Sequence, residues 1–193
     1  KETKAGDKER VVLFMSRVHP KKGIPKLIEA WRRLQPAGWR CVIVGPDEGG
    51  HVAQLRQLLK DHGLTRHFDF IDFASGDTKW NLLRDADIFA LPTESENFGV
   101  VVPEALAAGT PVLTTTGAPW RELETHRCGW WVEPDVDAIT EGLRAAMATT
   151  DTERAEMGKR GRALVEERYS WQRIATDMAS AYRWLLGEGE KPD

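Results

Sequence analysis

Residues 88–109 read IFALPTESENFGVVVPEALAAG, a pattern typical of a β-strand that turns directly into an α-helix. The strand is expected at 88–91, a short and wholly apolar run that ends at a proline. The helix is expected over about 100–108, and Gly109 ends it. Because proline is tolerated only in the first helical turn, Pro103 fixes where this helix begins.

Two carboxylates flank this turn, Glu96 before it and Glu104 inside the helix, eight residues apart. The backbone amides of residues 99–102 are expected to lack helical partners, and such a helix N-terminus attracts phosphate. Acidic side chains repel phosphate, so we expect the two glutamates to accept hydrogen bonds from uncharged sugar hydroxyls. The stretch therefore predicts a site in which two carboxylates bind two sugars on either side of a diphosphate.

The composition indicates one globular domain. The chain has 193 residues, of which 41% are hydrophobic and 30% charged, and its net charge is -3. This profile gives no general attraction to nucleic acid or anionic lipid. No apolar run approaches the roughly 20 residues that a membrane span needs. Cys41 and Cys128 lie in or beside apolar runs, so we expect buried free thiols rather than a disulfide.

Strand-like and helix-like segments alternate along the chain. Apolar strands are expected at 11–15, 41–44, 68–73, 88–91, 111–114 and 129–132. Helices are expected at 24–34, 51–62, 79–84 and 100–108, with a helical remainder over 136–186. This alternation predicts a doubly wound, Rossmann-like parallel sheet of about six strands with C-terminal helices. Ligands of such a sheet bind beyond the carboxyl ends of the strands, where the loops carry the site.

One of these loops carries three cations. Residues 16–23, Ser-Arg-Val-His-Pro-Lys-Lys-Gly, follow the first strand. Arg17 and Lys22 could meet a diphosphate, arginine as a planar fork and lysine as a point charge. A solvated basic loop is the alternative for this segment alone. Its place at the same sheet edge as the helix N-terminus favours a functional interpretation, with the two segments facing each other at the switch point of the sheet.

Together these segments resemble the C-terminal, donor-binding half of a GT-B glycosyltransferase of family 4, a retaining family. Residues 96–104 resemble its E-x7-E signature, and residues 16–23 resemble its arginine and lysine loop. Residues 108–112 resemble the segment after the second glutamate, and Ser170-Trp171 resembles the start of the final helix. Asp72 departs from the pattern, since many members carry glycine there, near the nucleobase pocket.

The resemblance implies that residues 1–193 form the nucleotide-sugar-binding domain, one half of a GT-B fold. It also implies that the N-terminal acceptor domain is absent from this chain. A start at Lys-Glu-Thr-Lys, with neither methionine nor a signal peptide, also suggests a piece of a longer protein. We expect a cytoplasmic protein that in full length could lie at the inner membrane face.

The resemblance also implies a donor-binding role for a set of residues around the turn. Glu104 would accept hydrogen bonds from the ribose hydroxyls of a nucleoside diphosphate sugar. The other donor-binding positions would hold the transferred sugar or offer amides to the diphosphate: Asn97, Phe98, Gly99, Val100 and Val101.

The catalytic residues that the resemblance implies are Arg17, Lys22 and Glu96. Arg17 and Lys22 would neutralise the charge that develops on the departing diphosphate, and Glu96 would hold hydroxyls of the transferred sugar. Retention is attributed to attack on the same face of the sugar, assisted by the leaving phosphate. We therefore expect a hexosyltransferase-like enzyme of polysaccharide or lipopolysaccharide biosynthesis, without metal or other cofactor, whose isolated domain is inactive.

Other interpretations stay open. Glu96 and Glu104 could be exposed glutamates that only stabilise the helix dipole. A non-catalytic nucleotide-sugar-binding or regulatory module could have the same fold. A dinucleotide oxidoreductase is disfavoured because no G-x-G-x-x-G follows the first strand. A phosphoacceptor signalling domain is disfavoured because that strand ends in Ser16-Arg17 rather than in an aspartate.

Several further features receive a weaker or a structural interpretation. Asp85 and Asp87 resemble the D-x-D metal motif of another glycosyltransferase fold, but they precede a strand at the opposite edge, so we expect solvated aspartates. The histidines form no i, i+4 pair on a helix, which indicates no metal site. The acidic loop 45–50 is expected to be a turn that could touch the nucleotide. Glu122 matches another acidic position of the family and is a weaker candidate.

The C-terminal region carries an apolar stripe. Its residues recur with helical spacing: Ile174, Met178, Ala181, Tyr182 and Leu185. The stripe could pack on this domain, or it could be exposed here because it belongs against the absent half. Four tryptophans in amphipathic segments are expected to pack: Trp31, Trp39, Trp171 and Trp184.

Overall fold

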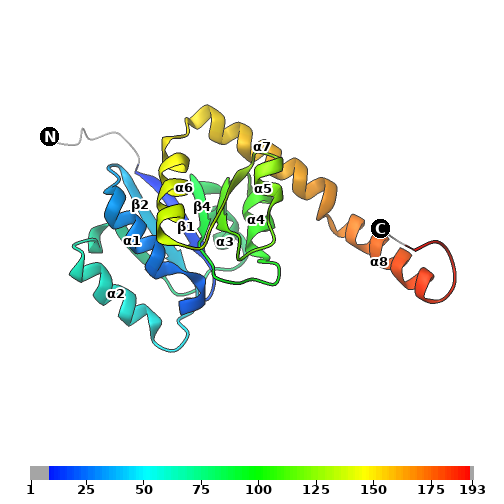
Figure 1. Cartoon of the computed structure of the whole chain (residues 1–193), viewed down its shortest axis with the longest axis horizontal. Helices are drawn as coiled ribbons and strands as arrows, with labels where there is room; N and C mark the ends of the chain where they lie inside the picture. Colours follow the sequence, from blue (N-terminus) through cyan, green and yellow to red (C-terminus); the bar gives the residue numbers. More distant parts are fainter. Residues whose placement is uncertain (1–8, 192–193) are drawn as a thin grey trace.

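Six β-strands form one sheet in the computed structural model, which describes residues 9–191 (Figure 1). The strands are β1 (Arg10–Met15), β2 (Trp39–Val44), β3 (Phe68–Ile71), β4 (Ile88–Leu91), β5 (Val112–Thr115) and β6 (Gly129–Val132). All neighbouring strands are parallel, and their order is β3-β2-β1-β4-β5-β6. The predicted doubly wound sheet is confirmed, and its order reverses between β1 and β4. The Lys-Glu-Thr-Lys start lies outside the described residues.

The helices form two layers. In one, α1 (Ile24–Leu34) contacts α2 (His51–Asp61) and α6 (Val136–Ala148). In the other, α4 (Val101–Ala108) contacts α3 (Gly76–Asp85) and α7 (Asp151–Arg168). Because crossover connections are right-handed, the change of direction after β3 places these layers on opposite faces of the sheet. The short elements η1 (Pro20–Lys22), η2 (Thr65–His67) and α5 (Glu122–Thr125) lie in the connections.

Some element boundaries differ from the expectation. The strand expected to reach residue 73 ends at Ile71. The Gly45 amide donates to the Ile71 carbonyl at 2.9 Å, just after β2 has ended at Val44, so the pairing of the two strands stops there. The long C-terminal helical region is divided by two side-chain caps. Thr150 accepts from the amide of Glu153, and Ser170 accepts from the amide of Arg173. These caps start α7 and the final helix.

The centre of the sheet is buried on both faces. Every residue of β4 and β5 is buried, as are residues 11–15 of β1. Such strands form continuous apolar runs in the sequence, which explains why uninterrupted apolar segments located them. Cys41 and Cys128 are buried free thiols, as expected. Burial raises the pKa of the Cys128 thiol to about 11 and also raises the pKa of Cys41.

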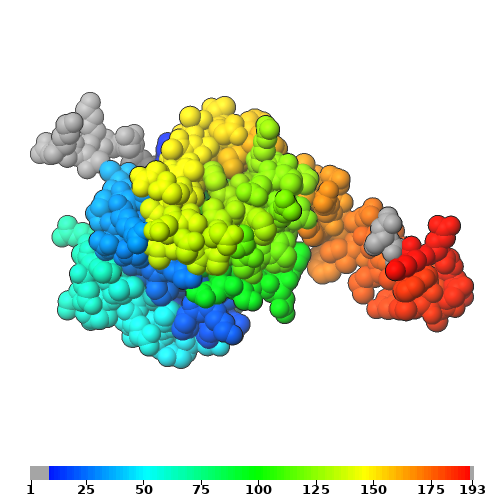
Figure 2. All heavy atoms as spheres, in the orientation of Figure 1, coloured from blue at the N-terminus to red at the C-terminus, as the bar shows by residue number. Residues whose placement is uncertain are grey.

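The final helix α8 (Trp171–Leu185) extends away from the body of the domain, and Figure 2 shows its orange and red atoms as a protrusion. No residue of α8 is buried against the described chain. The expectation that Trp171 and Trp184 pack is wrong, because they are 82% and 41% exposed. Helical periodicity shows which face of a helix is apolar but not what covers it. Within residues 9–191 no helix has both the length and the apolar character needed to cross a bilayer.

Candidate functional site

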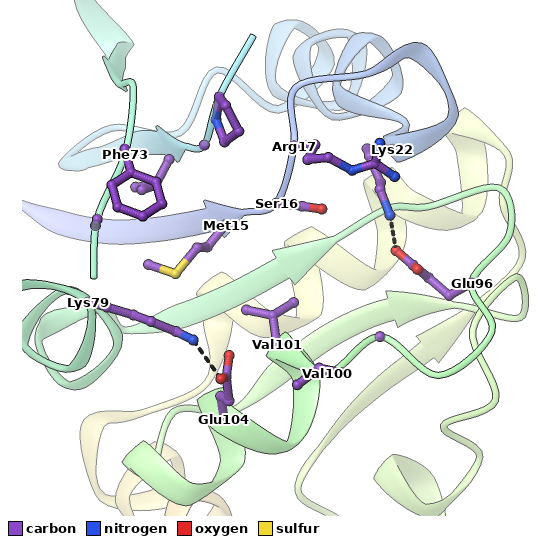
Figure 3. A pocket seen from close by; sticks show the side chains of 15 residues that line it. Met15, Ser16, Arg17, Lys22, Phe73, Lys79, Glu96, Val100, Val101 and Glu104 are labelled. Atoms are coloured by element: carbon purple, nitrogen blue, oxygen red, sulfur yellow. Dashed lines mark hydrogen bonds and ion pairs between the residues drawn. The ribbon is translucent and has the colours of Figure 1, made fainter. Parts of the chain in front are cut away.

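Two adjoining hollows open at the carboxyl ends of β1 and β4, which lie side by side in the sheet. The inner cleft has a volume of about 370 Å³ and extends from Phe73 and Lys79 to Lys22 (Figure 3). The outer cleft has a volume of about 540 Å³ and lies beyond Lys22, beside Asn97 and Phe98. This is the switch point at which doubly wound sheets bind ligands.

The structure places all nine site residues predicted from the sequence on the walls of these clefts. The inner cleft is lined by seven of them: Arg17, Lys22, Glu96, Gly99, Val100, Val101 and Glu104. Asn97 and Phe98 line the outer cleft, which shares its remaining predicted residues with the inner one. The two sequence segments therefore meet, although the roles assigned to their residues stay predictions.

The wall between the clefts is the N-terminus of α4. Gly99 has a φ of +76°, a conformation that favours glycine, and it turns the chain into the helix. The amide of Val102 donates to the Gly99 carbonyl at 2.8 Å, so the expectation of a free amide at this position is wrong. The amides of Gly99, Val100 and Val101 have no acceptor among residues 9–191. These three residues line the inner cleft, so three unpaired donors lie in its wall at the positive end of a helix dipole.

The loop after β1 is anchored to the loop after β4. The Lys21 carbonyl accepts from the Glu94 amide at 2.8 Å and from the Thr93 hydroxyl at 3.2 Å. Gly23 has a φ of +72°, and a Cβ there would lie 1.8 Å from the Pro92 carbonyl oxygen. Only glycine allows this close approach, which sets Lys22 opposite the N-terminus of α4.

Each predicted catalytic side chain is held in an ion pair. Lys22 Nζ donates to Glu96 Oε1, and the two side chains are only 12% and 14% exposed (Figure 3). Arg17 pairs with Glu48 at 2.6 Å, and its side chain is 63% exposed. Glu48 belongs to the acidic loop after β2 and lines the outer cleft. Arg17 and Lys22 thus line the same cleft as the unpaired amides. Each of these two cations is paired with a carboxylate.

Sequence reasoning missed Lys79. This residue of α3 points into the inner cleft, where its Nζ donates to Glu104 Oε1 at 2.5 Å (Figure 3). Lys79 follows the carboxyl end of β3, so the rule that ligands bind at that edge could have drawn attention to it. Phe73, which lines the same cleft, was missed because it was taken as the end of a strand. Gly45 and Pro46 of the loop expected to touch the nucleotide also line this cleft.

An aromatic cluster supports the turn before Gly99. Trp120 is fully buried, and its indole Nε1 donates to the Phe98 carbonyl at 2.5 Å. The Trp120 ring lies 5.0 Å from the Phe98 ring and 5.1 Å from the Tyr169 ring, centroid to centroid. These contacts fix the backbone that presents the unpaired amides.

Comparison with known proteins identifies the family. Residues 1–164 match the family described as glycosyl transferases group 1. The chain belongs to the group 1 glycosyltransferases. It is 32% identical over 180 residues to the uncharacterized glycosyltransferase MJ1607 of Methanocaldococcus jannaschii, covering 92% of this chain and 45% of that protein. The chain thus spans about half the length of the curated relatives it matches.

Solved structures agree with this assignment. Alr3699/HepE of Anabaena in complex with UDP has a TM-score of 0.78 and 25% identity, covering 90% of this chain and 49% of that one. The C-terminal domain of the group 1 protein LpcC of Francisella tularensis has a TM-score of 0.74 and 25% identity, covering 84% of this chain and 87% of that one. The expected C-terminal domain of a GT-B glycosyltransferase is confirmed.

Neither aspartate of the D-x-D-like pair, Asp85 or Asp87, lines either cleft of this glycosyltransferase domain. Asp87 is not a solvated aspartate as expected, because it accepts from the Val11 amide at 2.8 Å and lies 3.9 Å from Arg154. Asp85 is exposed, as expected. Among residues 9–191 no three His, Cys, Asp or Glu side chains are grouped so that they could hold a metal.

Glu122, the weaker candidate, lies outside the lining of both clefts. It accepts from the Tyr169 hydroxyl at 3.1 Å. Burial and the nearby Glu122 carboxylate raise the pKa of Tyr169 to about 12. In this glycosyltransferase domain Glu122 therefore supports the aromatic cluster.

Proposed function

We propose that this domain is the donor-binding half of a retaining glycosyltransferase that moves a sugar, a hexose by our expectation, from a nucleoside diphosphate sugar to an acceptor such as a glycan or a lipid-linked sugar. One observation carries the proposal. Two carboxylates, two lysines and three unpaired amides surround the same cleft at the switch point of the sheet.

The arrangement supports a specific pose for the donor. The inner cleft would hold the nucleoside, with Glu104 accepting hydrogen bonds from the ribose hydroxyls. The diphosphate would lie at the amides of residues 99–101. The transferred sugar would then reach the outer cleft, where Glu96 would accept hydrogen bonds from its hydroxyls beside the backbone of Asn97 and Phe98.

The cations of the site are suited to stabilising a leaving diphosphate. Glycosyl transfer proceeds through an oxocarbenium-like transition state, and in this reaction the leaving diphosphate is anionic. Groups that bind the leaving group better as its charge grows lower the barrier. Arg17 and Lys22 would exchange their carboxylate partners for that diphosphate, so the proposal requires neither a metal ion nor a protein nucleophile.

The related structures indicate which nucleotide to test first. Alr3699/HepE, 26% identical to this chain, was also solved with UDP-glucose. This supports a nucleoside diphosphate sugar as the ligand and makes UDP and UDP-glucose the first candidates. The alternative function is a non-catalytic nucleotide-sugar-binding module, because the same cleft would serve binding alone.

Calorimetric titration of the domain with UDP, GDP, ADP and their sugars tests the proposal. We expect one nucleoside diphosphate to bind and its affinity to be unchanged in EDTA. Failure of all three nucleotides to bind would refute a donor site, and loss of binding in EDTA would refute the metal-free mechanism. Assaying transfer after joining the domain to an acceptor half would then separate the enzyme from the binding module.

A further inference from the structure

Lys79 and Glu104 form an ion pair across the inner cleft, between α3 and the first turn of α4. Lys79 Nζ lies 2.5 Å from Glu104 Oε1, and the two side chains are 26% and 25% exposed. Within residues 9–191 neither side chain has a second ion-pair partner. Both line the inner cleft, so the pair is part of its wall rather than of the outer surface.

The ion pair leaves Glu104 able to bind a ligand. Only Oε1 is engaged, and Oε2 has no hydrogen-bond partner in the described part of the chain. A carboxylate can accept about four hydrogen bonds, so two ribose hydroxyls can still be accommodated. A glutamate held in one rotamer before binding loses less conformational entropy when the ligand arrives.

Lys79 also reduces the electrostatic repulsion between Glu104 and a bound diphosphate. Glu104 lies in the same helical turn as the unpaired Val101 amide, and an ionised carboxylate there opposes an anion. The inner cleft is lined by Arg17, Lys22 and Lys79 against Glu96 and Glu104, three cations against two anions. Lys79 offsets the charge of Glu104 within this lining, so the repulsion between that carboxylate and a diphosphate is reduced.

We propose that Lys79 is a positioning residue for the nucleotide, acting through Glu104. It holds the carboxylate toward the ribose hydroxyls and offsets the repulsion of that carboxylate for the diphosphate. The inference rests on the proposed function, because it takes Glu104 to be the ribose acceptor.

A double-mutant cycle tests this role, with calorimetric affinity for UDP (or for GDP or ADP, if the wild type binds one of these instead) as the readout. We expect Lys79→Met to weaken binding about 10-fold in the wild-type background. In the Glu104→Gln background the same substitution should change affinity less than about twofold, because its effect passes through the carboxylate. Lys79→Arg, which keeps the charge and the donors, should restore affinity to within about threefold of wild type.

Lys159→Met is the matched control. Lys159 pairs with Glu156 at 2.7 Å on α7, so the substitution removes the same charge and breaks a similar pair away from the cleft. It should leave affinity unchanged, and all variants should keep the wild-type thermal midpoint within about 2 °C.

The outcomes are distinguishable. If the wild type bound the nucleoside diphosphate and Lys79→Met bound it with the same affinity, the inference would be overturned and the proposed function would stand. A loss that persists in the Glu104→Gln background would also overturn it, because Lys79 would then act on the nucleotide directly or through the fold. If the wild type bound no nucleoside diphosphate, the proposed function would fail and the inference with it.

Discussion

At the scale of the residue, the two carboxylates of the cleft sit in different surroundings. Glu96 pairs with Lys22 at the junction of the inner and outer clefts, whereas Glu104 pairs with Lys79 in the wall of the inner cleft alone. Because a nucleoside and a transferred sugar lie on opposite sides of a diphosphate, these positions suit different parts of one donor. The two residues should therefore be separable by mutation.

Glu104→Ala should weaken binding of the nucleoside diphosphate about 10-fold or more, since it removes a charged acceptor from the ribose hydroxyls. Glu96→Ala should chiefly spare that binding and remove the preference for one sugar over another. Calorimetry with UDP and a set of UDP-sugars measures both effects, with Glu156→Ala on the outside of α7 as the control. Equal losses for all ligands in both variants would contradict the two assigned roles.

Gly99→Ala should lower both stability and affinity. Gly99 has a φ of +76°, and a Cβ there would make only ordinary contacts, at 3.6 Å or more. The cost is therefore conformational, about 1–2 kcal/mol of the free energy of unfolding, and relief of this strain would shift the amides that face the clefts.

Gly63→Ala is the matched control for this change, because Gly63 has a φ of +68° with no atom within 4 Å of its added Cβ. Urea unfolding should show similar losses of stability in the two variants. UDP affinity should fall only in Gly99→Ala. A similar fall in both would show that the amides contribute nothing specific.

At the scale of the element, α1 carries a local charge cluster on its exposed face. Glu29 accepts hydrogen bonds from Arg32 at 2.7 Å and from Arg33 at 3.0 Å. Arg32 donates a second hydrogen bond from Nη2 at 2.8 Å, and the hydrogen bonds from Arg32 and Arg33 lower the pKa of Glu29 from 4.5 to about 2. A lowered pKa in the folded state means that the carboxylate stabilises the fold above pH 4.5, and that this contribution disappears as the pH falls toward 2.

Glu29→Gln should therefore reduce the free energy of unfolding at pH 7 by less than about 1 kcal/mol, as is usual for partly exposed pairs. The difference from wild type should shrink as the pH falls from 4.5 to 2. Urea unfolding across this range, with Glu141→Gln on α6 as a comparison, measures it. A difference that stays constant with pH would exclude the ion-pair explanation.

The elements also show how far sequence reasoning reaches. Continuous apolar runs located the buried strands because both faces of a parallel sheet are covered, and the edge rule placed Arg17, Lys22 and Glu104 around one cleft. Lys79 was missed because its partner lies 25 positions away and only the fold brings them together. Asp87 was misjudged because its partner, the Val11 amide, lies near the amino end of β1, and only the fold brings the two residues together.

At the scale of the whole molecule, the domain presents the inner and outer clefts and a protruding, exposed helix α8. The chain spans less than half of the MJ1607 protein, 45%. We expect the isolated 193-residue chain to bind the donor weakly and to transfer sugar poorly or not at all, because the proposed function assigns the acceptor site to a domain other than this one. Radiolabelled sugar transfer by the purified chain, with and without a separately added acceptor half, measures this. Efficient transfer by the chain alone would overturn the expectation.

Nucleotide binding to the cleft also depends on the pairing of two strands that are far apart in the sequence. Lys22 and Glu96 lie 74 positions apart, and they meet only after β4 has been inserted beside β1, across the two earlier crossovers. Pairing of such distant segments is slow, because the chain must lose the entropy of closing a long loop before the stabilising contacts form. A nucleotide added during refolding should therefore bind only after β1 and β4 have paired, and its mass-action stabilisation would report on that pairing.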